Sequence, residues 1–94
     1  MARLRAEDLD RLGPLLGELR GVDALRERSS ATFTRGSAAF LHFHSFADGL
    51  VADLKVGDAW RRYPAGRAAD RRVVLRDVRR VLRGDTTGLA GRPT

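Results

Sequence analysis

Residues 38–56 read Ala38-Ala39-Phe40-Leu41-His42-Phe43-His44-Ser45-Phe46-Ala47-Asp48-Gly49-Leu50-Val51-Ala52-Asp53-Leu54-Lys55-Val56, and this stretch decides the fold. Asp-Gly between two runs rich in aromatic and aliphatic residues is a strong signal for a β-hairpin. A type I′ turn needs a positive φ at both central residues, and Asp and Gly tolerate it. We therefore predict a hairpin with the two-residue loop Asp48-Gly49, in which His44 faces Asp53.

The hairpin has two faces of different character, because successive side chains of a strand point to opposite sides of a sheet. A one-residue slip would exchange the faces, and the clean apolar set argues against that slip. We assign the apolar face to the core; it carries Ala39, Leu41, Phe43, Leu50, Ala52, Leu54 and Val56. The mixed face combines aromatic, titratable and charged side chains: Phe40, His42, His44, Phe46, Val51, Asp53 and Lys55.

The segments on either side of the hairpin supply two helices and two further strands. Leucines spaced at i, i+3 and i+7 predict the first helix, which Pro14 interrupts with a kink or a fresh start. Gly57-Asp58 predicts a second two-residue turn, and a clear apolar arc predicts the second helix. The expected elements are a helix over 6–20, a strand over 24–34, a strand over 59–63 and a helix over 68–83.

These elements predict an α+β fold of the order αββββα. The economical arrangement is a two-layer sandwich, in which a four-stranded antiparallel meander has the N- and C-terminal helices packed on one face. Ninety-four residues fit one small domain with one core, which we place at residues 1–84. The Gly-rich, polar segment 85–94 is expected to be a disordered tail.

Composition narrows the class of protein. Cysteine is absent, which excludes disulfides, thiol nucleophiles and Cys-ligated zinc. No run approaches the roughly 18 apolar residues of a membrane span, and no apolar segment follows the basic N-terminus, so we expect a cytoplasmic protein. The net charge of +6 comes from seventeen Arg and one Lys, a bias typical of GC-rich bacterial genomes.

One motif invites comparison with a known family. The run Gly36-Ser37-Ala38-Ala39-Phe40-Leu41-His42-Phe43-His44, followed by Ala52-Asp53-Leu54-Lys55, resembles the small bacterial α+β family often labelled "luciferase domain". Leu19-Arg20-Gly21-Val22 is similar to the helix-to-strand junction of that family, so the resemblance covers roughly residues 16–56. The label implies no demonstrated luciferase chemistry, and no catalytic residue is carried over.

The mixed face carries no helix in the expected arrangement, and three uses of it stay open. The first is self-association. An uncovered patch containing Phe40, Phe46 and Val51, to which the strand over 59–63 could add Trp60, would mark an interface, and a two-fold homodimer is the commonest way to cover one. On this interpretation the protein is a non-enzymatic binding or assembly module that forms a homodimer and has no cofactor.

The second use is a small-ligand or divalent-metal site at His42, His44 and Asp53. The two imidazoles leave the same side of one strand, and Asp53 lies across from His44. Two histidines and one carboxylate are a known ligand set for divalent metals. Alternatively, Asp53 accepts a hydrogen bond from His44 and fixes its tautomer. Lys55, opposite His42, would repel a cation.

The third use is nucleic-acid binding. Four arginines on one flank of the second helix could lie along a phosphate backbone, and aromatic side chains on an open sheet can stack unpaired bases. A solvated helix flank explains the arginines equally well, and the expected fold places them away from the mixed face. The flank carries Arg72, Arg76, Arg79 and Arg83, with Asp70 and Asp77 on the opposite flank.

Overall fold

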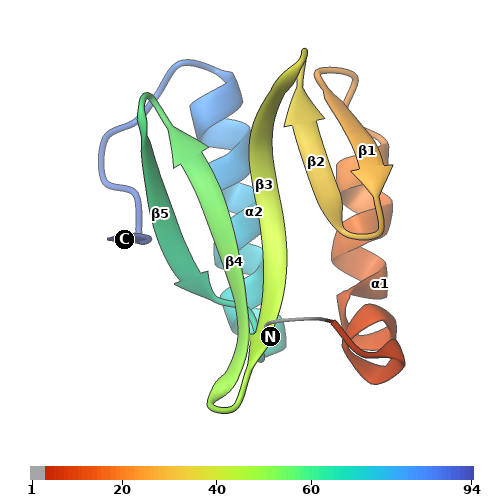
Figure 1. Ribbon diagram of the computed structural model, residues 1–94. Coiled ribbons are helices and arrows are strands. Elements are labelled where there is room, and N and C mark those ends of the chain that lie inside the picture. The colour runs from red at the N-terminus through yellow and green to blue at the C-terminus, as the bar shows by residue number, and fades with distance from the viewer. Residues whose placement is uncertain (1–3) are drawn as a thin grey trace.

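The computed structural model of the protein describes residues 4–94. Within them, two helices and one six-stranded antiparallel sheet give an α+β fold, and each strand pairs with its neighbour in sequence (Figure 1). None of the described helices has the length and apolar character needed to cross a membrane. The elements are α1 (Ala6–Arg20), β1 (Leu25–Ser29), β2 (Thr32–Arg35), β3 (Ala38–Phe46), β4 (Gly49–Val56), β5 (Ala59–Pro64), α2 (Ala68–Leu82) and β6 (Arg92–Pro93).

The predicted number of strands is wrong: four were expected, and the described residues form six. The segment 24–34 does not form one strand but folds into β1 and β2, joined by a tight turn in which Ala31 has a φ of 57°. A two-residue strand, β6, pairs with β5 and forms the edge of the sheet opposite to β1. The predicted two-residue turn at Gly57-Asp58 is confirmed, since Val56 pairs with Ala59.

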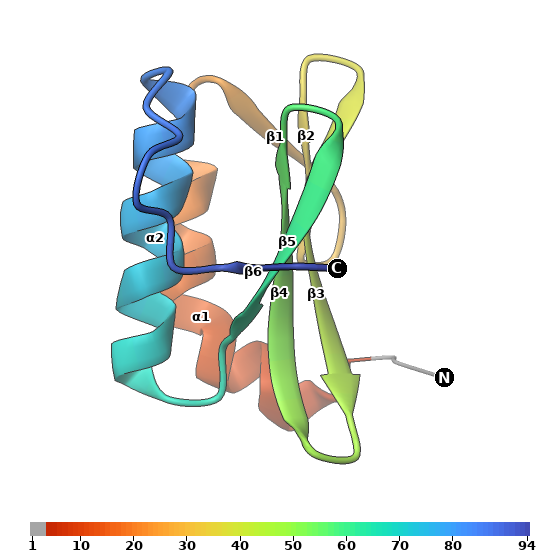
Figure 2. The same ribbon diagram turned by 90° about the vertical axis from the view of Figure 1, so that its left-hand side faces the viewer.

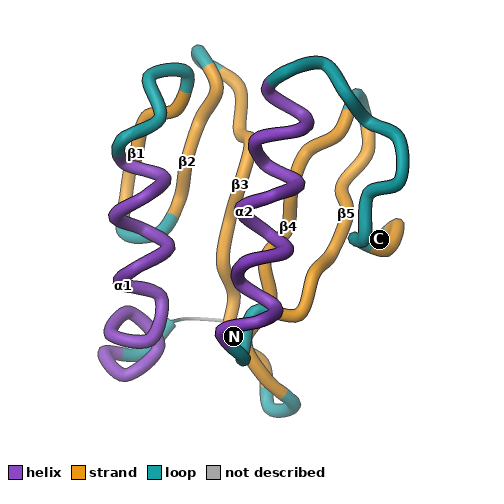
Figure 3. The backbone as a smooth tube through the Cα atoms, turned by 180° about the vertical axis from the view of Figure 1, so that it is seen from behind, coloured by secondary structure: helices purple, strands orange, loops and turns teal. Residues whose placement is uncertain are grey.

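The two helices divide the sheet between them. We expected both to pack on the apolar face of the central hairpin. Instead, α1 packs against α2 and β1, whereas α2 packs against α1, β4 and β5. Figure 3 shows α1 alongside β1 and β2, and α2 alongside β3 and β4. One continuous core joins the buried leucines of α1 and the buried valines of α2 to the inner side chains of the sheet.

Helix α1 runs through Pro14 without a break between Ala6 and Arg20. Of the two predicted alternatives, a kink or a fresh start at Pro14, the fresh start is therefore wrong. The buried stripe of the helix holds it against the core on both sides of the proline, since Leu12 and Leu16 are both buried. Tertiary packing of an apolar stripe can outweigh the local cost of one lost hydrogen bond.

From Leu41 onward, the β3–β4 hairpin keeps its predicted faces but not its predicted register. Phe46 pairs with Gly49, so the two-residue loop is Ala47-Asp48. Gly49 has a φ of 138°, which favours glycine, whereas Asp48 has no positive φ, so the turn is not of type I′. Every pairing is displaced by two residues from the prediction, and a displacement of two leaves each side chain on its face.

Phe40 lies in the core, although alternation placed it on the mixed face. Phe33 of β2 pairs with Leu41 of β3, and the next residue, Thr34, pairs with Ala39. Phe40 lies between these two pairs and is the extra residue of a β-bulge. It is 3% exposed, as deeply buried as the core residues around it. Because a bulge interrupts the alternation of side chains, the prediction for Phe40 is wrong, and so is the prediction for Ala39, which was assigned to the core and is exposed.

The segment 85–94, for which the sequence predicts disorder, lies against α2 and the edge of β5. Figure 2 shows it descending along α2 and then crossing to the sheet, where Arg92 and Pro93 form β6. The N–H of Ala90 donates a hydrogen bond to the carboxylate of Asp77 on α2 at 2.8 Å. The segment thereby adds one strand to the sheet.

Asp77 joins α2, β5 and the C-terminal segment through a fully buried carboxylate. Besides Ala90, the hydroxyl of Tyr63 donates to it at 2.7 Å and the Nε of Arg76 at 2.9 Å. Burial alone would raise the pKa of Asp77, but these donors outweigh it and hold the pKa below its ordinary value. Burial, reinforced by the neighbouring carboxylate, raises the pKa of Tyr63. Asp77 is therefore an ionised structural anchor.

Candidate functional site

The side of β3, β4 and β5 turned away from α2 gathers most of the residues predicted for the mixed face (Figure 2). Their inward neighbours, such as Leu41, Leu54 and Tyr63, are buried in the core. Phe46 is 39% exposed, and among residues 4–94 it is the only large hydrophobic side chain that is exposed. We call this surface the outer face; its central residues are His42, His44, Phe46, Val51, Asp53, Lys55, Trp60 and Arg62.

Four aromatic rings form a continuous row across the outer face. The centroid of the Trp60 ring lies 4.7 Å from that of His42. The centroids of His42 and His44 are 5.8 Å apart in an edge-to-face arrangement, and those of His44 and Phe46 are 5.9 Å apart. Ring pairs at such separations attract one another, so the row is preorganised, with neighbouring ring planes inclined by 38° to 85°.

A cation lies over each end of this row. The Nζ of Lys55 is 5.1 Å from the centroid of the Trp60 ring, and the Cζ of Arg62 is 5.1 Å from that of Phe46. Both distances are within the range of a cation–π interaction. The outer face therefore presents aromatic surface and positive charge together, an arrangement that suits an anion attached to a planar group.

Asp53 is the carboxylate at the centre of the outer face, and it is engaged by Arg62. The Nε of Arg62 donates to Oδ1 at 2.9 Å and its Nη2 to Oδ2 at 3.0 Å, a bidentate pair. The predicted contact with His44 also exists, since its Nε2 is 3.2 Å from Oδ2. The contact is diagonal, however, because the residue opposite Asp53 is His42 and not His44.

The arrangement does not form the predicted metal site. Within residues 4–94, no group of three His, Cys, Asp or Glu side chains is placed to hold a metal ion. His42, His44 and Asp53 share one face, but both oxygens of Asp53 accept hydrogen bonds from the guanidinium of Arg62. A divalent cation bound there would have to displace that charge and tolerate Lys55 beside it.

His42 is held in its neutral form at neutral pH. Burial lowers its pKa below the ordinary value, the neighbouring His44 lowers it further, and Asp53 offsets only part of the change. A neutral imidazole between Trp60 and His44 behaves as one more aromatic ring of the row. The row therefore keeps its stacking character at neutral pH.

Positive charge extends across the outer face to both edges of the sheet. On β6, Arg92 pairs with Arg62 and so lies on the same face. On β1, Arg26 is opposite Thr34 of β2, and the Nε of Arg28 donates to the hydroxyl of Thr34 at 3.3 Å. Among the outward positions of the described strands, Asp53 is the only acidic residue. The cations are Arg26, Arg28, Lys55, Arg62 and Arg92.

Two residues of the outer face could have been assigned from the sequence. The turn at Gly57-Asp58 was predicted, and a two-residue loop there places Trp60 opposite Lys55 and Arg62 opposite Asp53. Trp60 was a candidate for the patch, but the register was not extended into β5, and Arg62 was not assigned to this face. Arg92 could not be found in this way, because nothing in a polar, Gly-rich tail predicts strand β6.

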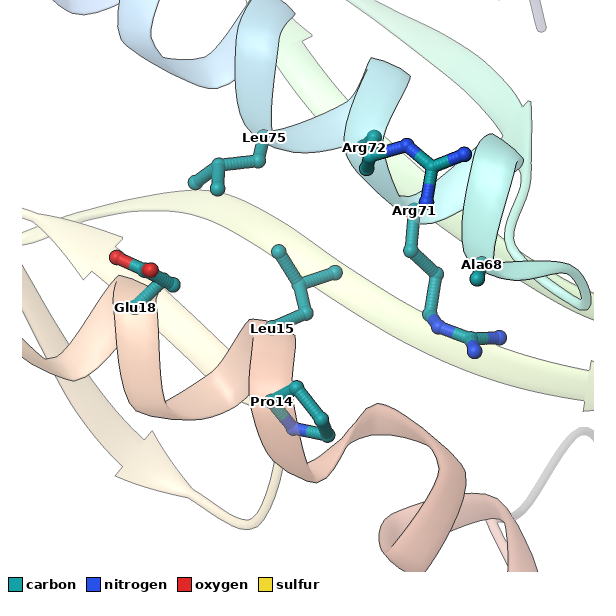
Figure 4. A pocket seen from close by; sticks show the side chains of 7 residues that line it. All are labelled: Pro14, Leu15, Glu18, Ala68, Arg71, Arg72 and Leu75. Atoms are coloured by element: carbon teal, nitrogen blue, oxygen red, sulfur yellow. The ribbon is translucent and has the colours of Figure 1, made fainter.

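The arginines predicted on α2 share one side of that helix, away from the outer face. Arg72, Arg76, Arg79 and Arg83 line a shallow groove with Leu75. Beside it, a cleft lies between α1 and α2 (Figure 4). Its lining residues are Pro14, Leu15, Glu18, Ala68, Arg71, Arg72 and Leu75.

Comparisons with known proteins do not assign the chain to a family. No family model matches it. No curated protein and no solved structure matches it either. The resemblance to the luciferase-domain family therefore stays a prediction, and the function has to be inferred from the site itself.

Proposed function

We propose that this protein is a non-catalytic binding module that takes single-stranded nucleic acid on its outer face. The observation that carries the proposal is the row of Trp60, His42, His44 and Phe46, with a cation over each end. Bases of a single strand stack on such rings, and their phosphates pair with the surrounding cations.

The charge of the outer face favours an anionic partner over a second copy of the chain. Its cations reach from Arg26 on β1 to Arg92 on β6, whereas its strand positions offer the carboxylate of Asp53, already paired with Arg62. Two such faces would repel each other on contact. A nucleic acid instead neutralises the cations and releases counterions, which supplies much of its binding free energy.

A single strand suits the outer face better than a duplex. The rings lie on an antiparallel sheet and not on a projecting helix or loop that could enter a groove. Only unpaired bases can lie against such a surface, since the bases of a duplex are stacked on each other. The contact requires no sequence preference, because every base has a π-face.

The first test uses the fluorescence of Trp60, the only tryptophan of the sequence. We expect a thymine oligonucleotide to quench it at low salt, because a base stacked on the ring changes its surroundings. The logarithm of the binding constant should fall against that of the salt concentration with a slope of about −2 to −3.5, if three to five phosphates are neutralised.

The matched control for that test is an abasic oligonucleotide of the same length. It keeps the phosphates and removes the bases, so it should bind more weakly and leave Trp60 unquenched. Equal binding of both oligonucleotides would show that the rings do not stack on bases. No binding of either at low salt would contradict the proposal altogether.

Self-association through the same face is the second candidate function, favoured by the exposure of Phe46. If the protein forms a homodimer in this way, Phe46→Glu should reduce the molar mass in light scattering to that of one chain. Thr86→Glu, on the exposed part of the tail, is the control and should not. Salt should strengthen such a dimer, because it screens the repulsion between cationic faces. A wild-type mass of one chain in both low and high salt would exclude it.

A further inference from the structure

The groove along α2 is a second cationic surface, separate from the outer face. Four arginines line it, at positions that recur every three or four residues, and Leu75 is its apolar contact. Helix α2 stands behind the sheet, and the outer face turns away from it (Figures 2 and 3). A ligand in this groove and one on the outer face would therefore lie on different sides of the molecule.

The charge of the groove is only partly balanced. Arg76 donates to the buried Asp77, and Arg79 forms an exposed ion pair with Glu18 at 3.3 Å. Arg72 and Arg83, at the two ends of the row, form no ion pair within residues 4–94, and both are exposed. Like charges on neighbouring turns of a helix destabilise it slightly, so nothing in the folding of α2 requires this row.

The row matches the charge spacing of a phosphate backbone. From Arg72 to Arg83 it spans about 16 Å at 1.5 Å per residue. One strand of a duplex carries about five phosphates over that length. An acidic amphipathic helix would instead need several apolar anchors along the groove. Leu75 is the apolar residue that the groove offers. The cleft in Figure 4 adjoins the groove and shares Arg72 and Leu75 with it.

We propose that the arginine row of α2 binds the phosphate backbone of double-stranded nucleic acid without reading its bases. Arginine guanidinium groups suit phosphate oxygens, and none of the rings of the outer face is involved. This inference rests on the proposed function in one respect: if the outer face holds a single strand, one molecule bridges a duplex and a single strand.

The test compares two variants of equal net charge. Arg72→Gln/Arg83→Gln removes the two ends of the row without breaking an ion pair. Arg11→Gln/Arg35→Gln removes two exposed arginines outside both surfaces. Binding of a labelled DNA duplex is followed by fluorescence anisotropy over a range of salt concentrations. We expect the first variant to make the log–log salt slope shallower by about 2, and the control to leave it close to that of the wild type.

The quenching of Trp60 by a thymine oligonucleotide is measured in parallel and should be the same in all three proteins. A biotinylated duplex on beads should capture a labelled single strand only when the wild-type protein is present. Failure of the quenching alone would remove the proposed function and the bridging, but not the duplex site.

Four results would overturn the duplex site. The first is no duplex binding at low salt. The second is an equal loss in the control Arg11→Gln/Arg35→Gln, which would make net charge the cause. The third is competition by the thymine oligonucleotide for the same site. The fourth is binding of polyglutamate in place of the duplex, dependent on Arg72 and Arg83, which would show that the groove takes an acidic protein segment.

Discussion

Replacing Asp77 by alanine is expected to lower the free energy of unfolding by about 3–5 kcal/mol, the largest effect on stability that we predict. The substitution removes three hydrogen bonds to a charged acceptor and leaves the hydroxyl of Tyr63 and the N–H of Ala90 without their partner. In a domain of this size the loss corresponds to a fall in Tm of roughly 15–30 °C. Thermal unfolding followed by circular dichroism measures it.

Asp77→Asn separates the charge of this residue from its shape. An amide oxygen can still accept from Tyr63 and Ala90, whereas the amide nitrogen faces Arg76, which is exposed and free to move away. We therefore expect Asn to cost less than Ala. If Asn and Ala destabilise the protein equally, the charge of Asp77 and not its geometry holds the anchor.

The same anchor gives the stability of the protein a defined dependence on pH. The pKa of Asp77 is lower in the folded protein than its ordinary value of 3.8, so the unfolded chain takes up its proton first as the pH falls. The contribution of Asp77 is therefore complete above about pH 4 and is lost as the pH falls through the folded pKa. Asp77→Asn should show a smaller loss of stability in that range than the wild type.

Much of the sheet could be predicted, because the face on which a side chain lies depends only on whether its position in the strand is odd or even. The turn at Asp48-Gly49 was displaced by one position and every pairing by two, yet His42, His44 and Asp53 stayed on one face. The Cβ alternation of a strand makes that result insensitive to any even shift. Ala39 and Phe40 are the exceptions, because a bulge adds one residue and the alternation changes there.

The role of Asp77 could not be predicted, because its partners come from distant parts of the chain. On the helix alone it belongs to a polar flank that would face solvent. Its burial depends on Tyr63 of β5 and on the C-terminal segment, whose Gly-rich composition predicts disorder. Gly91 shows how closely the two pack, since a Cβ there would lie 2.3 Å from the Tyr63 ring. Tight packing of a segment with little apolar surface leaves no periodic signal in the sequence.

The second large effect is expected at Trp60, on binding and not on folding. Trp60→Ala removes the first ring of the row and the surface under Lys55, and should weaken binding of a thymine oligonucleotide by about 5- to 150-fold, or 1–3 kcal/mol. Because the variant lacks tryptophan, anisotropy of a labelled oligonucleotide replaces intrinsic fluorescence. Duplex binding, which we assign to α2, should be unchanged.

Trp60→Phe is the matched control, since it keeps a ring of smaller area beside His42. Its affinity should lie between those of the wild type and Trp60→Ala, and its salt slope should equal that of the wild type, because no cation is removed. A parallel loss of Tm in Trp60→Ala alone would point to misfolding, so both variants are compared by thermal unfolding. If Ala and Phe bind the oligonucleotide as tightly as Trp, the row does not stack on bases, and only the cations of the outer face are left to explain binding.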